Sequence, residues 1–143
     1  MLISQLSIFA ENKPGILGEI TKELGKANVD IRAMSIAAST DFGIFSLIVN
    51  DIEKAKKALS DAEFVVSETK VLAVAVPDTP GALTDMMTIL SENGINIEYM
   101  YAFVTVSKQN AYVVLRVLDN DAAIEILTKN GIKLICNDDI KNL

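Results

Sequence analysis

The apolar positions of this chain form strand-length runs that alternate with helical stripes, and the same order occurs twice. Two apolar runs, residues 2–9 and 71–76, are each followed by Pro-Gly and then by apolar residues at helical spacing. One stripe consists of Leu17, Ile20, Leu24 and Ala27, and the other of Leu83, Met86, Met87 and Leu90. The pattern predicts a strand followed by a helix at the start of each half.

The two halves are copies of one module. Residues 11–17 align with residues 77–83 at a shift of 66, and residues 43–49 align with 111–117 at a shift of 68. The second copy therefore carries a two-residue insertion before Asn110. We predict two domains, 1–69 and 70–143, joined by the short polar link 67–70.

Further strands are expected at 29–38, 43–49 and 63–67 in the first copy and at 95–106, 110–118 and 132–136 in the second. The turns 39–42 and 107–109 join the middle strands. Second helices begin at Asp51 and Asp119, where an acid favours the positive end of the helix dipole.

The first helix of each copy has recognisable start and stop signals. Pro14 and Pro80 suit the first helical position, with Thr79 as a helix cap in the second copy. Asn28 and Gly94 occupy equivalent positions and tolerate the left-handed conformation that ends a helix.

Each copy thus reads as strand, helix, strand, strand, helix, strand, which predicts an α+β fold of two ferredoxin-like βαββαβ modules. Each module should be a four-stranded antiparallel sheet with two helices on one face. We expect the modules to pair side by side into one eight-stranded antiparallel sheet with four helices on one face.

Composition favours a soluble, self-associating protein. Half of the 143 residues are hydrophobic, the mean hydropathy is +0.34, and such an apolar surface predicts a homodimer. No apolar stretch is long enough to span a membrane, and the single cysteine, Cys136, cannot form an internal disulfide. We expect a cytoplasmic protein without membrane contact.

The charge and the missing residue types restrict the chemistry. A net charge of −6 without basic clusters argues against nucleic acid as a partner. Without histidine and with one cysteine, the chain lacks the usual general base and the usual metal ligands. We expect no catalytic residues, no metal and no cofactor, and therefore not an enzyme.

The strand-to-helix loops predict a binding site by their own chemistry. A turn through Pro-Gly leaves the first N–H groups of the helix free, and Gly15 or Gly81 lets a ligand approach the backbone. A free amino acid's carboxylate suits that helix end. Asn12 and Asp78 can reach across the same loops.

At the start of the next strand, Asp30 and Asn96 can accept a hydrogen bond from the ligand's ammonium or bridge to the neighbouring module. Structural explanations stay open beside these: a tight turn for the glycines, helix capping for Asn12, and solvated strand starts for Asp30 and Asn96. The loop residue is Asn12 in the first copy and Asp78 in the second, whereas the strand residue is Asp30 in the first and Asn96 in the second. The two sites therefore need not be equivalent.

The chain resembles the ACT domain, an amino-acid-sensing module. The resemblance lies in residues 12–17 (NKPGIL) with 29–31 (VDI), and again in residues 78–83 (DTPGAL) with 95–97 (INI). It covers nearly the whole chain, whereas the Cys-x-x-Cys loop of copper chaperones and the loop arginine of acylphosphatases are absent. In that family, ligands lie between paired modules, which implies the following binding residues here: Asn12, Gly15, Ile16, Leu17, Asp30, Asp78, Gly81, Ala82, Leu83 and Asn96.

The resemblance implies a non-catalytic regulator that binds a free amino acid and signals to a partner metabolic enzyme or regulator. Two alternatives remain. One is a regulatory or interaction subunit, similar to the small subunit of acetolactate synthase, with a weak or vestigial ligand site. The other is a transcriptional or glycine-cleavage-type regulator that acts through a partner.

Tyr99, Tyr101 and Phe103 in the second copy are explained by sheet packing or by an asymmetric pocket wall.

Overall fold

The computed structural model describes residues 1–104 and 109–143, and these divide into two compact units. The N-terminal unit comprises Ser4–Thr69 with Ile140–Leu143, and the C-terminal unit comprises Met1–Ile3 with Lys70–Asp139. Each end of the described chain therefore groups with the other half. The bounds 1–69 and 70–143 stay a prediction for independently folding domains.

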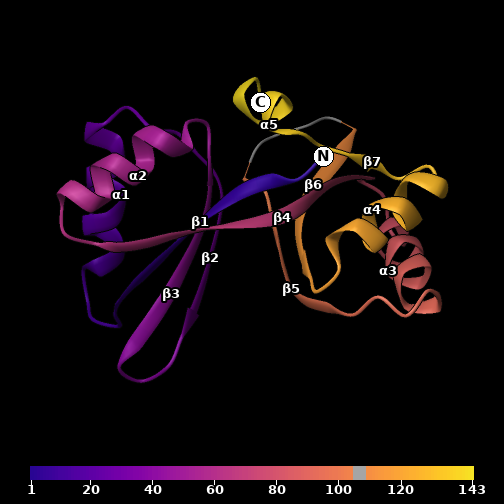
Figure 1. Cartoon of the computed structure of the whole chain (residues 1–143), viewed down its shortest axis with the longest axis horizontal. Helices are drawn as coiled ribbons and strands as arrows, with labels where there is room; N and C mark the ends of the chain where they lie inside the picture. Colours follow the sequence, from indigo (N-terminus) through magenta and orange to yellow (C-terminus); the bar gives the residue numbers. More distant parts are fainter. Residues whose placement is uncertain (105–108) are drawn as a thin grey trace. The chain divides into compact units, whose positions relative to one another are not determined.

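The N-terminal unit follows the predicted βαββαβ order. Its elements are β1 (Ile3–Glu11), α1 (Ile16–Lys26), β2 (Ile31–Ala38), β3 (Phe42–Val49), α2 (Ile52–Asp61) and the first part of β4 (Val65–Pro77). The strand order is β2-β3-β1-β4, so β2 lies at an edge. Helices α1 and α2 lie beside strands β1 and β3 (Figure 1). The apolar core of this unit includes Leu6, Ile8, Ile20, Leu24, Phe45, Leu47 and Leu59.

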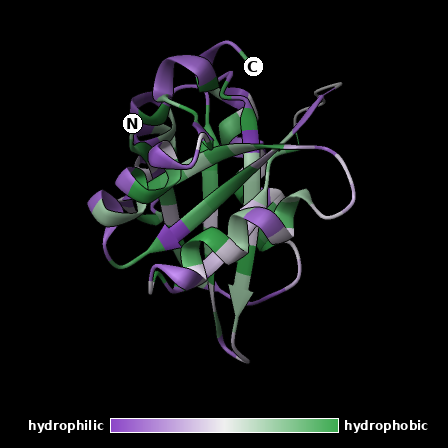
Figure 2. Cartoon of the chain, turned by 90° about the vertical axis from the view of Figure 1, so that its right-hand side faces the viewer, coloured by the Kyte–Doolittle hydropathy of each residue, from purple (hydrophilic) through white to green (hydrophobic). Residues whose placement is uncertain are grey.

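The C-terminal unit repeats this order. After β4 come α3 (Ala82–Glu92), β5 (Ile97–Ala102), β6 (Asn110–Val117), α4 (Asn120–Lys129) and β7 (Lys133–Leu134). Strand β4 pairs with both β6 and β7, and β5 is at an edge. The strands are mostly hydrophobic, whereas the helices carry both kinds of residue (Figure 2). This is the pattern of helices with one buried and one solvated face.

The count of elements differs from the prediction. Residues 1–104 and 109–143 hold seven strands and five helices, not eight and four. The expected strands 63–67 and 71–76 form one strand, β4, of 13 residues. The polar residues 67–70 between them include no glycine or proline, so nothing interrupts the extended backbone. Side-by-side pairing of two complete sheets stays a prediction.

The fifth helix, α5 (Asn137–Lys141), was not predicted. It is a single turn, too short for a periodic pattern. The Asp139 carboxylate accepts hydrogen bonds from the backbone N–H of Cys136 at 2.9 Å and from its thiol at 3.2 Å. This local capping pair accounts for the turn.

Several predicted helix boundaries are confirmed. Asp51 and Asp119 cap α2 and α4, where each carboxylate accepts from the backbone N–H three residues later. Asn28 and Gly94 have positive φ angles of 56° and 71°, the left-handed conformation expected after α1 and α3.

Each unit has one irregularity at the same place in the repeat. The pairing of β2 with β3 shifts register between Ile31 and Ala33, and that of β5 with β6 shifts between Ile97 and Tyr99. Arg32 and Glu98 are therefore the extra residues of two equivalent bulges. A bulge changes the direction of the side chain it carries.

Part of one predicted strand and turn lies outside the described residues. The strand 95–106 is described as β5, ending at Ala102, while residues 105 and 106 and the turn residues 107 and 108 are not described. Within the described part of the chain, no helix is long and apolar enough to cross a membrane.

Candidate functional site

The two Pro-Gly pairs form type II turns that precede their helices. The N–H of Ile16 donates to the Lys13 carbonyl at 3.3 Å, and Gly15 between them has φ 89° and ψ −11°. These are the angles that a type II turn requires at its third residue, with proline favoured before it. Ala82 bonds to Thr79 in the same way, around Gly81 with φ 89° and ψ −17°.

This geometry corrects the predicted helix starts. The helices begin at Ile16 and Ala82, so Pro14 and Pro80 lie two residues before them and not at the first helical position. The N-caps are Gly15 and Gly81, which displaces Thr79. A type II turn places the proline one residue before the left-handed glycine, and the helix can only begin after that glycine.

The glycine caps leave helix N–H groups available. Neither α1 nor α3 has a side-chain hydrogen bond to its N-cap. Ile16 and Ala82 use their N–H groups in the turns, so the second and third helical positions, Leu17 with Gly18 and Leu83 with Thr84, have no intrahelical acceptor. A Cβ on Gly15 or Gly81 would meet no atom within 4 Å. Small anions can therefore approach both turns.

Asn12 joins the first turn to the neighbouring hairpin. Its backbone N–H donates to the Asp41 carbonyl and its side-chain amide to the Ser39 carbonyl, both at 2.8 Å. The side chain thus braces the hairpin and does not cap α1. In the second copy the N–H of Asp78 donates to the Gln109 carbonyl at 3.1 Å. A carboxylate has no N–H to copy the amide bond, so the two loops differ chemically.

Asp30 lies at the other end of the sheet. Its backbone N–H donates to the side-chain oxygen of Asn50 at 2.9 Å, just beyond β3, whereas Asn12 lies next to the residues that precede β3. Strand β3 has eight residues and spans about 23 Å. A free amino acid is too short to touch both ends. The structure therefore brings Asn12 and Gly15 together but not Asp30.

The carboxylate of Asp30 has a partner that sequence reasoning missed. Arg32 Nη1 lies 2.7 Å from Asp30 Oδ2, and Arg32 Nη2 donates to the Lys141 carbonyl at 3.3 Å. The Asp30 side chain is still largely exposed. The spacing Asp-x-Arg was a local signal for the ion pair, but the bulge at Arg32 interrupts the alternation on which that signal depends.

The second copy arranges its charges differently. Asn96 is exposed and neutral, and Glu98 stands at the position equivalent to Arg32. Glu98 Oε2 lies 3.3 Å from Arg116 Nε, and Arg116 also donates to the Lys70 carbonyl at 3.2 Å. Each strand start therefore carries one acid–arginine pair, but only the first contacts the 140–143 segment.

The apolar residues predicted to bind ligand have different surroundings. Ile16 is a buried member of the core, and Leu17 packs against it half-buried. Ala82 is half-buried and Leu83 is exposed. The side chain of Ile16 serves the core, so its contribution to a site would be through its backbone. Leu83 is the one of these side chains that projects into solvent.

The aromatic stripe of the second copy is mostly buried. Tyr101 and Phe103 are nearly inaccessible, and Tyr99 is partly exposed with its ring 6.4 Å from that of Tyr101. Phe103 makes an edge contact with Tyr112 at 6.1 Å. Burial, and secondarily Tyr99, raises the pKa of Tyr101 well above its usual range. This favours sheet packing over a pocket wall.

Two shallow hollows lie on the N-terminal unit. One, of about 470 Å³, is lined by Lys141 and by residues 50–53 at the start of α2. The other, of about 330 Å³, lies between α1 and α2.

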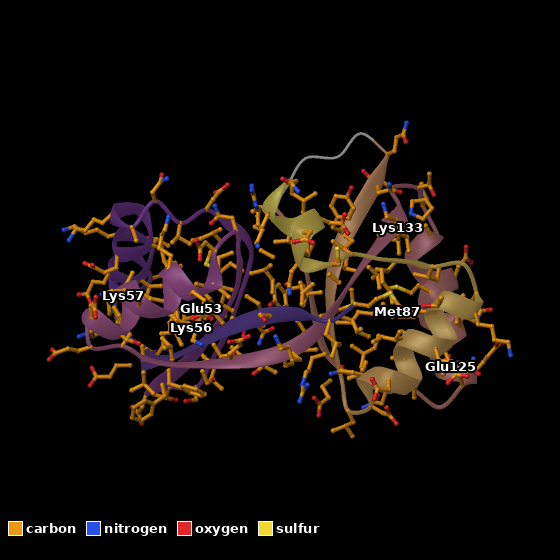
Figure 3. The ribbon with its side chains drawn as sticks, turned by 45° about the horizontal axis from the view of Figure 1, so that its top comes forward. Glu53, Lys56, Lys57, Met87, Glu125 and Lys133 are labelled. Carbon is orange, nitrogen blue, oxygen red and sulfur yellow. The ribbon has the colours of Figure 1, made fainter. Side chains whose placement is uncertain are left out.

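Lys56 on α2 lies near Glu53 (Figure 3) and donates to Glu68 at 3.2 Å, a hydrogen bond that raises the pKa of Lys56. Within the described chain, no group of three acidic, cysteine or histidine residues could hold a metal ion.

Comparison with known proteins decides the family. The model of an ACT domain pair matches residues 1–143. The chain belongs to the ACT domain pair family. This confirms the resemblance seen in the sequence. Among curated proteins, none matches the chain.

Several solved structures resemble the chain. Protein BT0572 from Bacteroides thetaiotaomicron is 42% identical with a TM-score of 0.92, covering 100% of this chain and 98% of that one. The ligand-free regulatory subunit of aspartate kinase from Thermus thermophilus has a TM-score of 0.63 at 16% identity, over 88% and 91% of the two chains. The regulatory subunit of aspartate kinase from Thermus flavus has a TM-score of 0.58 at 16% identity, and the match covers 90% of this chain and 94% of that one. The two aspartate kinase subunits share the fold.

Proposed function

We propose that this ACT domain pair is a non-catalytic cytoplasmic regulator that binds a free amino acid between modules and signals occupancy to a partner metabolic enzyme. The observation that carries the proposal is the doubled type II turn. Each turn presents uncapped helix N–H groups beside an open glycine. Such a helix end favours a small carboxylate.

The separation of the turn from Asp30 supports a site shared by two modules. Strand β2 is an edge strand, and residues 36–38 at its far end are exposed. If the β2 edges of two chains pair antiparallel, the Asn12 loop of one chain comes to the same end as Asp30 of the other. The ligand carboxylate would then bind the helix N–H groups and its ammonium would bind the Asp30 carboxylate. The proposed homodimer completes the site.

Thermal unfolding against each of the twenty amino acids at millimolar concentration tests this function. A ligand at about 100 times its Kd stabilises the fold by about 2.7 kcal/mol. That raises the Tm of a chain of this size by roughly 5–10 °C. A shift with one chemically related group of amino acids supports the proposal. No shift with any of the twenty contradicts it.

Paired glycine variants locate the site. Gly15→Asp and Gly81→Asp add a carboxylate where we expect the ligand carboxylate, so they should abolish the Tm shift. Gly131→Asp is a matched control, because Gly131 also has a positive φ, 73°, with open space around it but lies after α4. Equal ligand shifts in Gly15→Asp, Gly81→Asp and Gly131→Asp would overturn the assignment.

A second candidate is a regulatory or interaction subunit with a vestigial ligand site. The observation in its favour is an exposed apolar group on the N-terminal unit: Phe42 is 66% exposed, and Phe9 and Ile44 are paired neighbours on β1 and β3 that are also exposed. Stoichiometric co-purification of an enzyme, with no response to any amino acid, would favour this candidate over the sensor.

A further inference from the structure

The 140–143 segment (Ile140–Leu143) belongs to the N-terminal unit although residues 70–139 before it belong to the other. Its first side chain, Ile140, is only 2% exposed. The Lys141 carbonyl accepts from Arg32 Nη2, and Lys141 lines the hollow at the start of α2. The segment therefore contains one buried side chain and accepts one hydrogen bond from Arg32.

Arg32 is held between the 140–143 segment and Asp30. It is the extra residue of the β2 bulge, and its side chain is 14% exposed. One guanidinium nitrogen lies 2.7 Å from Asp30 Oδ2 and the other bonds to Lys141. Its buried Nε has no hydrogen-bond partner among the described residues. Because the guanidinium is planar, fixing one nitrogen fixes the direction of the other.

The second module lacks this link. At the equivalent bulge stands Glu98, whose partner Arg116 bonds to the Lys70 carbonyl inside its own unit. Both arginines thus pair with a carboxylate and bond to one backbone carbonyl. Only Arg32 connects its carboxylate to the 140–143 segment.

We propose that the 140–143 segment is a strap that positions Asp30, through Arg32, for the ligand's ammonium. The inference rests on the proposed function for its ligand, but the strap itself needs none. With Lys141 holding one end of the guanidinium, the other end orients Asp30 Oδ2 and leaves the exposed side of the carboxylate to accept from an ammonium. Because coupling is reciprocal, ligand binding in turn tightens the strap. Arg32 is a positioning residue and does not touch the ligand.

Hydrogen exchange of peptides within residues 137–143, measured without ligand, tests the strap. Arg32→Ala should speed exchange there by removing the fastening. Arg32→Lys keeps the charge but loses the planar fork, so exchange should be intermediate. Arg116→Ala, the matched control, removes an equivalent pair and carbonyl bond and should leave exchange in this segment unchanged. Equal exchange in Arg32→Ala and wild type overturns the strap.

The amino-acid affinity of full-length variants tests the coupling. With an amino acid that shifts the Tm of the wild type, Arg32→Ala should weaken binding about fivefold or more, while Arg116→Ala should not. Unchanged affinity in Arg32→Ala overturns the positioning role. Absence of any amino-acid shift in the wild type counts against the proposed function, and the exchange experiment still decides the strap.

Discussion

At the scale of single residues, one left-handed glycine in each module determines where the strand-to-helix loop ends and the helix begins. Gly15 and Gly81 share a φ of 89° and nothing lies within 4 Å of their missing side chains. The glycine is therefore required by backbone conformation and not by crowding. The open space beside it is what a ligand would use.

Gly15→Ala should destabilise the protein by about 1–2 kcal/mol, because L-residues are disfavoured at positive φ. Gly18→Ala should instead stabilise by about 0.5–1 kcal/mol, since Gly18 lies within α1 with open space around it. Denaturant unfolding of the two variants checks the pair. Changes of the same sign would mean that Gly15 is not held in the left-handed region.

The Asp139 carboxyl should titrate below 3.8, the ordinary pKa of an aspartate. The backbone N–H of Cys136 is the main cause of the lowered pKa, and the thiol is the second. A lowered folded pKa gives stability that is present above the unfolded pKa and lost as the pH falls through the folded one. NMR titration of the carboxyl checks this. Cys136→Ala should raise the midpoint only part of the way, and a full return to 3.8 would contradict the ranking of causes.

Residue types in the sequence identified the Pro-Gly turns, but they did not identify the ion-pair partner of Asp30. The Pro-Gly pairs predicted a loop and a helix in each copy. Proline is favoured both at the first helical position and at the second residue of a type II turn, and choosing the first of these placed the helix start two residues too early. The ion pair between Asp30 and Arg32 was missed because a bulge and a carbonyl from residue 141 determine where the arginine lies. No local pattern encodes such a distant acceptor.

At the scale of elements, the two halves share their helix caps. Asp51 and Asp119 lie at equivalent positions and bond to the N–H groups of Lys54 and Ala122, both at 3.0 Å. Their roles were predictable from sequence because a cap is a local interaction within four residues. The continuity of β4 was not, because polar residues in a strand resemble a linker when only hydropathy is considered.

Asp51→Ala and Asp119→Ala should each lower the free energy of unfolding by about 1 kcal/mol. The two caps share no partner, so the double variant should lose the sum within about 0.5 kcal/mol. Asp51→Asn keeps a side-chain acceptor and should cost much less. Denaturant unfolding of the four variants checks this. Equal free energies of unfolding for Asp51→Ala and Asp51→Asn would rule out capping as the cause.

At the scale of the whole molecule, duplication provides the fold, and the copies differ in the charged residues near the starts of β2 and β5. The same strand order and bulge position occur in both units. The repeat in the sequence predicted the βαββαβ order of both units, but neither the continuous strand β4 nor the helix α5. It could not predict which half each end of the chain would join, because that grouping depends on contacts between residues far apart in the sequence.

The proposed dimer should depend on the β2 edge. Ile36→Glu places a charge on that edge and should shift the protein towards monomer and reduce the amino-acid-dependent Tm rise. Val65→Glu is the matched control, since Val65 is an exposed aliphatic residue of β4, away from that edge. Light scattering across a concentration series checks both. Equal masses for the two variants would contradict pairing through β2.

The exchange of chain ends between the units has a consequence for biosynthesis. The N-terminal unit includes residues 140–143, so the ribosome must make the whole second module before the first can be completed. At about 5–20 residues per second, the first module remains for several seconds without the hydrogen bond from Arg32 to the Lys141 carbonyl. Its strands and helices can pair during translation, but the strap can close only after residues 140–143 have left the exit tunnel. Ligand affinity should therefore develop later than the fold of the first module.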